Sequence, residues 1–456
     1  MLKSTPHIGL QSLPIGFGPN GKLFRKLAGA AVGSALVRFA GIGLSFLVGV
    51  QLARLLGPAH FGIYGTTIAI VALLAVPVQL GLPQLLTREL AACREGRLFG
   101  RMRAALVGFA GAVAAASIMI VALASVWLIL WPPSAPALAS ALTVGLLLVP
   151  VVAWLNLSCG ALRGLGHVVS AHVFDAVARQ GLLAAGLFAV GVSSLDFDAT
   201  TALLMQFAIG AFVLVACVAM VRRALPLELT AVSPKYDTRT WTRSAVPMAG
   251  TEILRAIDAH YPILLLGLIA GLDDVGVFRV ALSVAAFVGL PSSLIATVIM
   301  PEVARLHAAR EREQVQFIAS ASAAVIFTAT ALLVATIFAV GEPALTLVFG
   351  DAFAPAWLPL LLISIAYLIN GYFGAAASML NMCGGERAVT LAFAFGPPVG
   401  IATVFALFDS LGVAAVALGM IASEIAKGVL LSAAATRQLE IRVGLAHALM
   451  RLFHRS

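Results

Sequence analysis

Apolar stretches long enough to cross a bilayer recur along the whole 456-residue chain, and they constrain its fold more than any other feature. About 20 apolar residues cross the hydrocarbon core as a helix, and turn residues separate successive stretches. We predict an all-α polytopic membrane protein with about twelve transmembrane helices. The predicted spans are 30–52, 62–86, 104–130, 137–160, 169–192, 201–221, 245–270, 275–299, 316–340, 357–380, 388–408 and 412–435.

The composition supports a bilayer environment. Hydrophobic residues make up 61% of the chain and charged residues only 11%, against about 25% charged residues in a soluble globular protein. In such a chain the net charge of +9 is first a topology signal, so we predict no nucleic-acid partner. The four cysteines lack CxxC spacing and the eight histidines show no HExxH pattern, so we predict no metal site and no cofactor.

The basic residues predict the orientation. Of the 29 Lys and Arg residues, 23 fall on one side of the predicted membrane, five lie within spans, and one, Arg54, lies in a loop on the other side. Since basic loops stay in the cytoplasm, we predict a bacterial inner-membrane protein with both termini in the cytoplasm. The densest basic segments are Arg88–Arg103, Arg222–Arg243 and Arg305–Arg312.

The longest polar connection between spans divides them into two groups of six, which suggests two structural repeats of the kind found in secondary transporters. The predicted division is a cytoplasmic N-terminal tail, an N-lobe with spans 1–6, a cytoplasmic linker, a C-lobe with spans 7–12 and a cytoplasmic C-terminal tail. These parts cover residues 1–27, 28–221, 222–244, 245–436 and 437–456.

Basic residues inside spans are costly, and they usually face a bundle interior or a water-filled cavity. Arg38 lies near the middle of span 1 with no acid within one helical turn, so it needs a partner on another helix, a wet cavity or an anionic ligand. Arg255 is also central, whereas Arg279 lies close enough to a span end for its stem to snorkel. We predict that Arg38, Arg255, Arg279 and Lys427 line a cavity, with a purely structural role as the alternative.

The acidic residues within spans lie at helical spacing from basic ones. Glu252 and Asp258 flank Arg255 at intervals of three residues, and Glu424 precedes Lys427 by three. These acids either neutralise their neighbours or titrate and couple transport to protons or sodium, so Glu252, Asp258 and Glu424 are candidates for ion coupling. Asp175 and Arg179, four residues apart on span 5, are explained more simply as a self-neutralising pair.

Several cations in one cavity suit a phosphate or pyrophosphate, because guanidinium groups bind such oxygens bidentately. This chemistry favours an anionic substrate over a cationic drug.

Short motifs along the chain resemble Wzx-type polysaccharide flippases of the multidrug/oligosaccharidyl-lipid/polysaccharide superfamily. The resemblance runs from about residue 27 to residue 440, and the order of the motifs is more specific than any one of them. The motifs are LARLLGPAHFGIY at 52–64, GLPQLLTRE at 81–89, LRGLG at 162–166, PEVARLH at 301–307, VFGDAF at 348–353, GGER at 384–387 and LGVAA at 411–415.

The resemblance implies two six-helix lobes around a central cavity that opens alternately to each side of the membrane. It also implies a substrate, an oligosaccharide linked to undecaprenyl pyrophosphate, which moves from the cytoplasmic to the periplasmic leaflet. Such a flippase serves the synthesis of a capsule, a lipopolysaccharide O-antigen or an exopolysaccharide, with polymerase and co-polymerase proteins as partners. Arg38 and Arg255 stand where members of this family often have cavity charges, and Arg279 and Lys427 match less closely.

Two other functions compete with a flippase. A membrane enzyme of lipid-linked glycan assembly needs a large extramembrane loop or an acidic metal motif, but the longest predicted outer loop, near 341–356, has only Glu342 and Asp351 as acids. We therefore expect no enzyme. A drug/cation antiporter of the same superfamily would favour an acidic or aromatic cavity, whereas the spans here contain five basic and four acidic residues.

Overall fold

The computed structural model describes residues 21–192, 197–230 and 232–445, and every regular element in these ranges is helical. The first half contains α1 (Gly21–Gln79), α2 (Leu82–Glu95), α3 (Phe99–Leu130), α4 (Pro136–Gly164), α5 (Val168–His172), the π-helix η1 (Val173–Ala178), α6 (Arg179–Val192) and α7 (Ala199–Ala224). The second half contains the 3-10 helix η2 (Leu227–Thr230), α8 (Thr238–Ile269), α9 (Leu272–Val288), α10 (Leu290–Ala308), α11 (Arg312–Phe349), the 3-10 helix η3 (Asp351–Ala356), α12 (Trp357–Phe373), α13 (Ala376–Met382), α14 (Glu386–Leu411) and α15 (Val413–Leu439). The predicted all-α class is confirmed for this part of the chain.

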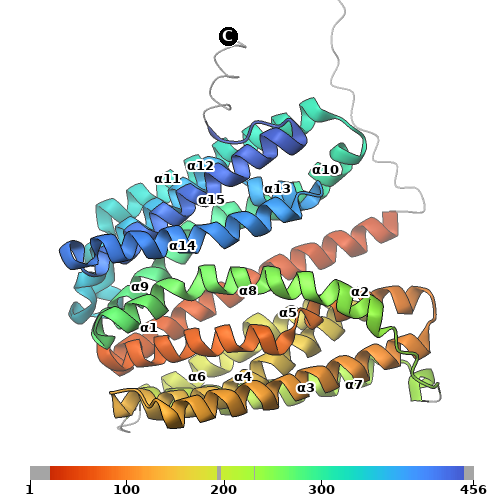
Figure 1. Ribbon diagram of the computed structural model, residues 1–456, viewed down its shortest axis with the longest axis horizontal. Helices are drawn as coiled ribbons and strands as arrows, with labels where there is room; N and C mark the ends of the chain where they lie inside the picture. Colours follow the sequence, from red (N-terminus) through yellow and green to blue (C-terminus); the bar gives the residue numbers. More distant parts are fainter. Residues whose placement is uncertain (1–20, 193–196, 231, 446–456) are drawn as a thin grey trace, which may run out of the picture.

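Ten helical segments of the described chain are long and apolar enough to cross a membrane. The first of them reverses direction at Gly57, whose φ of 67° and ψ of 175° interrupt α1. Figure 1 shows the two arms that result, running in opposite directions. α8 is not among the ten, and its 32 residues include Glu252, Arg255 and Asp258. The two arms of α1 correspond to two predicted spans and α8 to a third, but the count of twelve is not exactly confirmed, because ten segments are long and apolar enough.

Two helices end earlier than the predicted spans. The span expected over 62–86 ends at Gln79, because Leu80 and Gly81 adopt positive φ values of 51° and 68° and turn the chain into the separate helix α2. The span expected over 357–380 breaks at Gly374, with φ 65°, between α12 and α13.

The predicted tails are described only in part. Residues 1–20 of the N-terminal tail and residues 446–456 of the C-terminal tail lie outside the described residues. Within the described chain, α1 already begins at Gly21 and α15 ends at Leu439.

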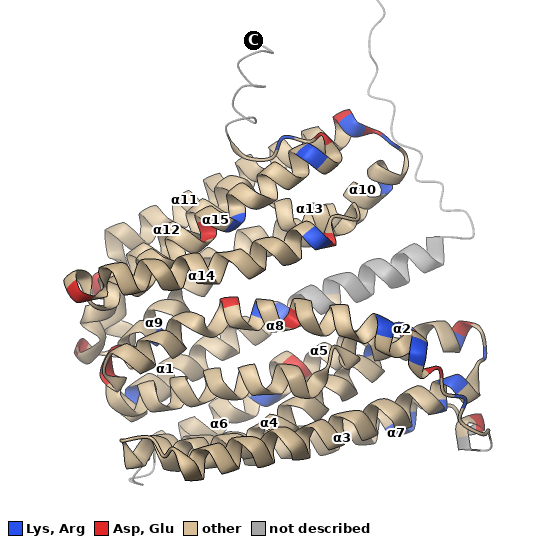
Figure 2. Cartoon of the chain, viewed as in Figure 1, with Lys and Arg blue, Asp and Glu red and all other residues tan. Residues whose placement is uncertain are grey.

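The helices form two bundles, which Figure 1 shows one above the other. In the first bundle α4 packs against α1, α2, α3 and α7, and in the second bundle α15 packs against α12 and α14. α1 connects the two bundles through its contacts with α8 and α9. Figure 2 shows Lys and Arg gathered at one end of the molecule, which we call the basic end.

The second arm of α1 and α9 touch backbone to backbone at two glycines. A Cβ on Gly62 would lie 1.7 Å from the carbonyl oxygen of Leu272, and one on Gly276 would lie 2.0 Å from the carbonyl oxygen of Pro58. Small residues let membrane helices approach this closely. The contact fixes α9, which carries Arg279, against α1.

Gly276→Ala is expected to destabilise the protein, because the new methyl group meets backbone that cannot move aside as a side chain can. Overpacking of this kind costs about 1–3 kcal/mol. Gly111→Ala is the matched control, since a Cβ there has no atom within 4 Å. Thermal unfolding in detergent, followed by size-exclusion chromatography, measures both variants. An unchanged midpoint for Gly276→Ala would contradict the close approach.

Candidate functional site

Two adjoining cavities lie beside the first arm of α1, among helices of the first bundle and α9. The larger, which we call the mouth chamber, has a volume of about 670 Å³, and the smaller, the deep chamber, about 340 Å³. Ser45, Arg179, Gln180 and Ser283 line both chambers, so the two chambers are adjacent at these residues.

The chambers follow each other along the first arm of α1. The mouth chamber is lined by residues within 38–46 of this arm and the deep chamber by residues within 45–52. Arg163, near the end of α4, also lines the mouth chamber. Arg94, from the basic segment Arg88–Arg103, donates a hydrogen bond of 2.7 Å to the carbonyl of nearby Leu165, so the mouth chamber lies toward the basic end. The deep chamber is lined by later residues of the same arm, and because a helix rises 1.5 Å per residue it lies farther from the basic end.

The mouth chamber is mainly cationic. Three arginines, Arg38, Arg163 and Arg179, line it together with a single acid, Asp175, and His172. The described structure contains no ion pair between any of these arginines and a carboxylate. Guanidinium groups left without a carboxylate in a wet cavity are suited to an anionic ligand.

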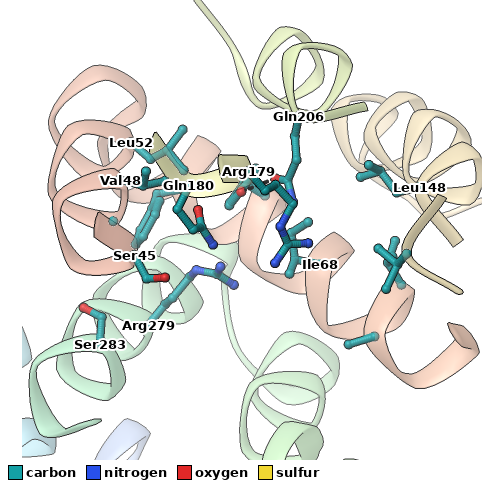
Figure 3. A pocket seen from close by; sticks show the side chains of 16 residues that line it. Ser45, Val48, Leu52, Ile68, Leu148, Arg179, Gln180, Gln206, Arg279 and Ser283 are labelled. Carbon is teal, nitrogen blue, oxygen red and sulfur yellow. Dashed lines mark hydrogen bonds between the residues drawn. The ribbon is translucent and has the colours of Figure 1, made fainter. Parts of the chain in front are cut away.

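The deep chamber holds a second arginine, Arg279, in a lining of nine apolar or glycine residues and seven polar ones. The guanidinium carbon of Arg279 lies 5.4 Å from the ring centre of Phe61 and 5.2 Å from that of Tyr64. The Tyr64 hydroxyl donates a hydrogen bond to Oε1 of Gln206. Figure 3 shows Arg179, Arg279, Gln180 and Gln206 directed into the same space.

The π-helix η1 places Arg179 at the junction of the two chambers. The first arm of α1 packs directly on η1, since a Cβ on Gly41 would lie 2.6 Å from that of Ala176. π-Helices occur often at functional sites, and their wider turn breaks the α-helical stacking of residues four apart. This register explains why no ion pair joins Asp175 to Arg179 in the described structure, although their spacing suggested one.

A separate charge cluster joins three helices of the second half. Nζ of Lys427 on α15 lies 2.7 Å from Oδ2 of Asp258 on α8 and 2.7 Å from Oε1 of Glu424. Asn370 on α12 donates to the other oxygen of Glu424 at 3.1 Å. Lys427 is 6% exposed, so this ammonium is enclosed by its two carboxylates. We call these four residues the ion cluster.

The structure places the four predicted cavity cations in two regions, Arg38 and Arg279 at the chambers and Arg255 and Lys427 beside Phe393. Arg38 lines the mouth chamber and Arg279 the deep chamber. Lys427 belongs to the ion cluster, and its Nζ lies 5.3 Å from the ring centre of Phe393. The exposed Arg255 contacts the same ring, with its guanidinium carbon 5.3 Å from the ring centre. Of the candidates for ion coupling, Asp258 and Glu424 meet at Lys427, whereas Glu252 lies half-buried on α8 outside the cluster.

Several lining residues escaped the sequence prediction. Arg163 lies in the predicted loop between the spans 137–160 and 169–192, and Arg179 was assigned to a pair with Asp175. Gln180 and Gln206 interrupt apolar spans, and polar residues within spans are themselves a signal of an interior cavity.

The two bundles touch at both ends: α2 packs on α8 at the basic end, where Arg88 donates a hydrogen bond of 3.0 Å to Ser244, and a second contact lies at the opposite end. Arg54 donates hydrogen bonds of 2.7 Å and 2.5 Å to the carbonyls of Val348 and Leu347, near the end of α11. Beside this contact the rings of Phe46 and Phe349 meet edge to face with centres 5.9 Å apart. We call this contact the distal contact.

A comparison with protein families decides what kind of chain this is. Residues 31–307 match the model of a family described as "Polysaccharide biosynthesis protein". The chain belongs to this polysaccharide biosynthesis family. No curated protein sequence matches it significantly.

Solved structures show the fold of this family member. An inward-facing multidrug resistance MATE transporter of the MOP superfamily matches with a TM-score of 0.73 at 14% identity, over 92% of this chain and 98% of that one. An outward-facing structure of a multidrug resistance MATE transporter gives 0.60 at 15% identity, over 93% and 96% of the two chains. The lipid II flippase MurJ, in an inward closed conformation, gives 0.69 at 11% identity, over 93% and 91%. The family and fold predicted from the motifs are confirmed, and these neighbours are transporters and a flippase, not enzymes.

Proposed function

We propose that this protein carries an oligosaccharide linked to undecaprenyl pyrophosphate across the bacterial inner membrane. The observation that supports this most is the mouth chamber, where Arg38, Arg163 and Arg179 converge in a member of the polysaccharide biosynthesis family. Each guanidinium group can bind two phosphate oxygens at once, which suits a pyrophosphate. The apolar polyprenyl chain stays in the surrounding lipid while its headgroup occupies the chamber.

The basic end faces the cytoplasm in this proposal, because basic loops are retained there. Both termini then lie in the cytoplasm, and cargo moves from the cytoplasmic to the periplasmic leaflet. The product feeds the assembly of a capsule, O-antigen or exopolysaccharide by polymerase and co-polymerase proteins.

Alternating access requires the distal contact to open. Arg54 and the aromatic pair hold the bundles together on the periplasmic side, and the fold matches an inward-facing MATE structure better than an outward-facing one. Release of cargo to the periplasm therefore breaks the hydrogen bonds of Arg54.

Locking the distal contact is expected to stop export. Arg54→Cys combined with Leu347→Cys, joined by a short bifunctional methanethiosulfonate that forms a disulfide with each thiol, holds the bundles together at this end. Surface polysaccharide should fall to the level of a strain without the protein and return after reduction. Each single cysteine variant, treated in the same way, is the control. Undiminished export in the cross-linked protein would show that this contact does not open during transport.

The ion cluster is our candidate for coupling to protons or sodium. It sets two carboxylates, Asp258 and Glu424, against one ammonium, Lys427, so one negative charge is in excess. A bound proton or sodium ion offsets that excess. Its release leaves one uncompensated negative charge between α8 and α15. Gradients of each ion, imposed separately on proteoliposomes, distinguish the two.

Reconstitution tests the proposed function directly. Proteoliposomes carry a fluorescent oligosaccharide on polyprenyl pyrophosphate, and an impermeant quencher reports how much has reached the outer leaflet. We expect faster exchange between leaflets than in protein-free vesicles. Exchange at the protein-free rate, with transport of an organic cation instead, would support the drug/cation antiporter alternative that the MATE-like fold favours.

A further inference from the structure

We infer that the deep chamber binds a carboxylate-bearing sugar of the cargo, which makes the protein a carrier of acidic oligosaccharides. This inference rests on the proposed function and adds the class of glycan. It assigns Arg38 and Arg163 to the pyrophosphate and Arg279 to the sugar, with Arg179, which lines both chambers, within reach of either group.

The charge of the deep chamber is the first argument. Two arginines, Arg179 and Arg279, are among its sixteen lining residues, and none of the sixteen is Asp or Glu. Neither arginine forms an ion pair within the described chain. Two such charges at membrane depth are costly unless water or an anion offsets them. An anionic ligand therefore stabilises this chamber more than a neutral one.

Unused hydrogen-bonding groups are the second argument. Nε of Arg179 is buried and finds no acceptor among the described residues. The carbonyl of Gln206 accepts from Tyr64, which leaves the amide hydrogens of Gln206 free to donate. A carboxylate fits a guanidinium fork, while Gln180 and the hydroxyls of Ser45 and Ser283 are suited to sugar hydroxyls.

The order of the chambers is the third argument. A lipid-linked sugar that enters from the basic end with its pyrophosphate beside Arg38 and Arg163 extends its first sugars past Arg179 into the deep chamber. The volume of about 340 Å³ lies within the range of small-molecule sites and equals on the order of ten water molecules. This space admits a sugar ring with its carboxylate but not the whole glycan.

Binding measurements on the full-length protein in lipid nanodiscs test the inference. The probes are a glucuronic acid-containing disaccharide, its neutral counterpart cellobiose, and inorganic pyrophosphate. In the wild-type protein the acidic disaccharide is expected to bind about tenfold more tightly than cellobiose, the effect of one charge-assisted pair. Arg279→Gln is expected to remove this preference while changing pyrophosphate affinity less than about twofold, and Arg38→Gln should weaken pyrophosphate binding about tenfold.

Each outcome has a distinct meaning. Equal binding of the two disaccharides, or an Arg279→Gln variant that loses pyrophosphate binding as strongly as Arg38→Gln, overturns the inference. If the acidic disaccharide fails to bind while pyrophosphate binds, the inference fails and the proposed function stands. If pyrophosphate fails to bind while the acidic disaccharide binds through Arg279, the proposed pyrophosphate site fails and the carboxylate site stands.

Two further variants separate loss of binding from loss of fold. Arg279→Lys keeps the charge but not the guanidinium fork, so a preference for the acidic disaccharide should persist at reduced strength. Arg222→Gln removes an exposed arginine at the basic end, outside both chambers, and should bind all three probes like the wild type. If Arg279→Lys unfolds at the wild-type temperature and still shows no preference for the acid, the carboxylate site is also overturned.

Discussion

Replacing Arg38 and Arg179 together with glutamine is expected to slow translocation of the lipid-linked oligosaccharide roughly 100-fold or more. Both side chains line the mouth chamber, and neither is neutralised by a carboxylate within the described chain. A hydrogen bond to a charged group contributes about 1.5–3 kcal/mol. Two such groups lost together correspond to at least about two powers of ten in affinity for the pyrophosphate.

The proteoliposome exchange assay measures this loss, and surface polysaccharide reports it in cells. Each single variant should lose about tenfold, and Arg222→Gln, which lies outside both chambers, should exchange at the wild-type rate. Immunoblots of the membrane fraction show whether the double variant is still inserted. Full exchange by an inserted double variant would remove the mouth chamber from the transport path.

The spans were predictable because a helix needs about 20 apolar residues to cross the hydrocarbon core. Basic residues also gather in the loops on the cytoplasmic side, which orients the spans. Gly57 and Pro58 interrupt the first long apolar run, and the chain does reverse there. The end of the second span was not predictable. Leu80 adopts a positive φ that leucine rarely takes, and the apolar run continues through it into α2. A separate helix at that point depends on packing, which hydropathy does not contain.

The candidate site was predictable only from a basic residue that has no acidic residue near it in the sequence. Arg38 has no acid near it in sequence, and it does line a chamber. Arg255 looks equally central in sequence, but its guanidinium lies over Phe393, a contact between α8 and α14 that spacing cannot reveal. The place of Arg179 in the site was not predictable, because Asp175 four residues earlier suggested an ion pair. Nothing in the sequence marks the π-helix that separates the two side chains.

The ion cluster carries the second large effect, on stability. Lys427→Met is expected to destabilise the protein by about 3–5 kcal/mol, because it leaves Asp258 and Glu424 facing each other without their shared ammonium. Thermal unfolding in detergent should show a clearly lower midpoint. Arg222→Met, which removes an exposed arginine of α7, is the control for loss of one positive charge.

A triple variant separates the charge from the shape of this site. Lys427→Met with Asp258→Asn and Glu424→Gln removes the uncompensated charges, and replacing a whole buried ion group is often neutral or stabilising. Its midpoint should therefore return toward that of the wild type. If the triple variant is stable and its exchange no longer responds to a proton or sodium gradient, the cluster couples transport to that ion. If it is stable and responds like the wild type, the cluster only holds α8, α12 and α15 together. A low unfolding midpoint in the triple variant would mean that the Lys427 side chain contributes packing as well as charge. Its aliphatic stem lies against α14 at Gly396.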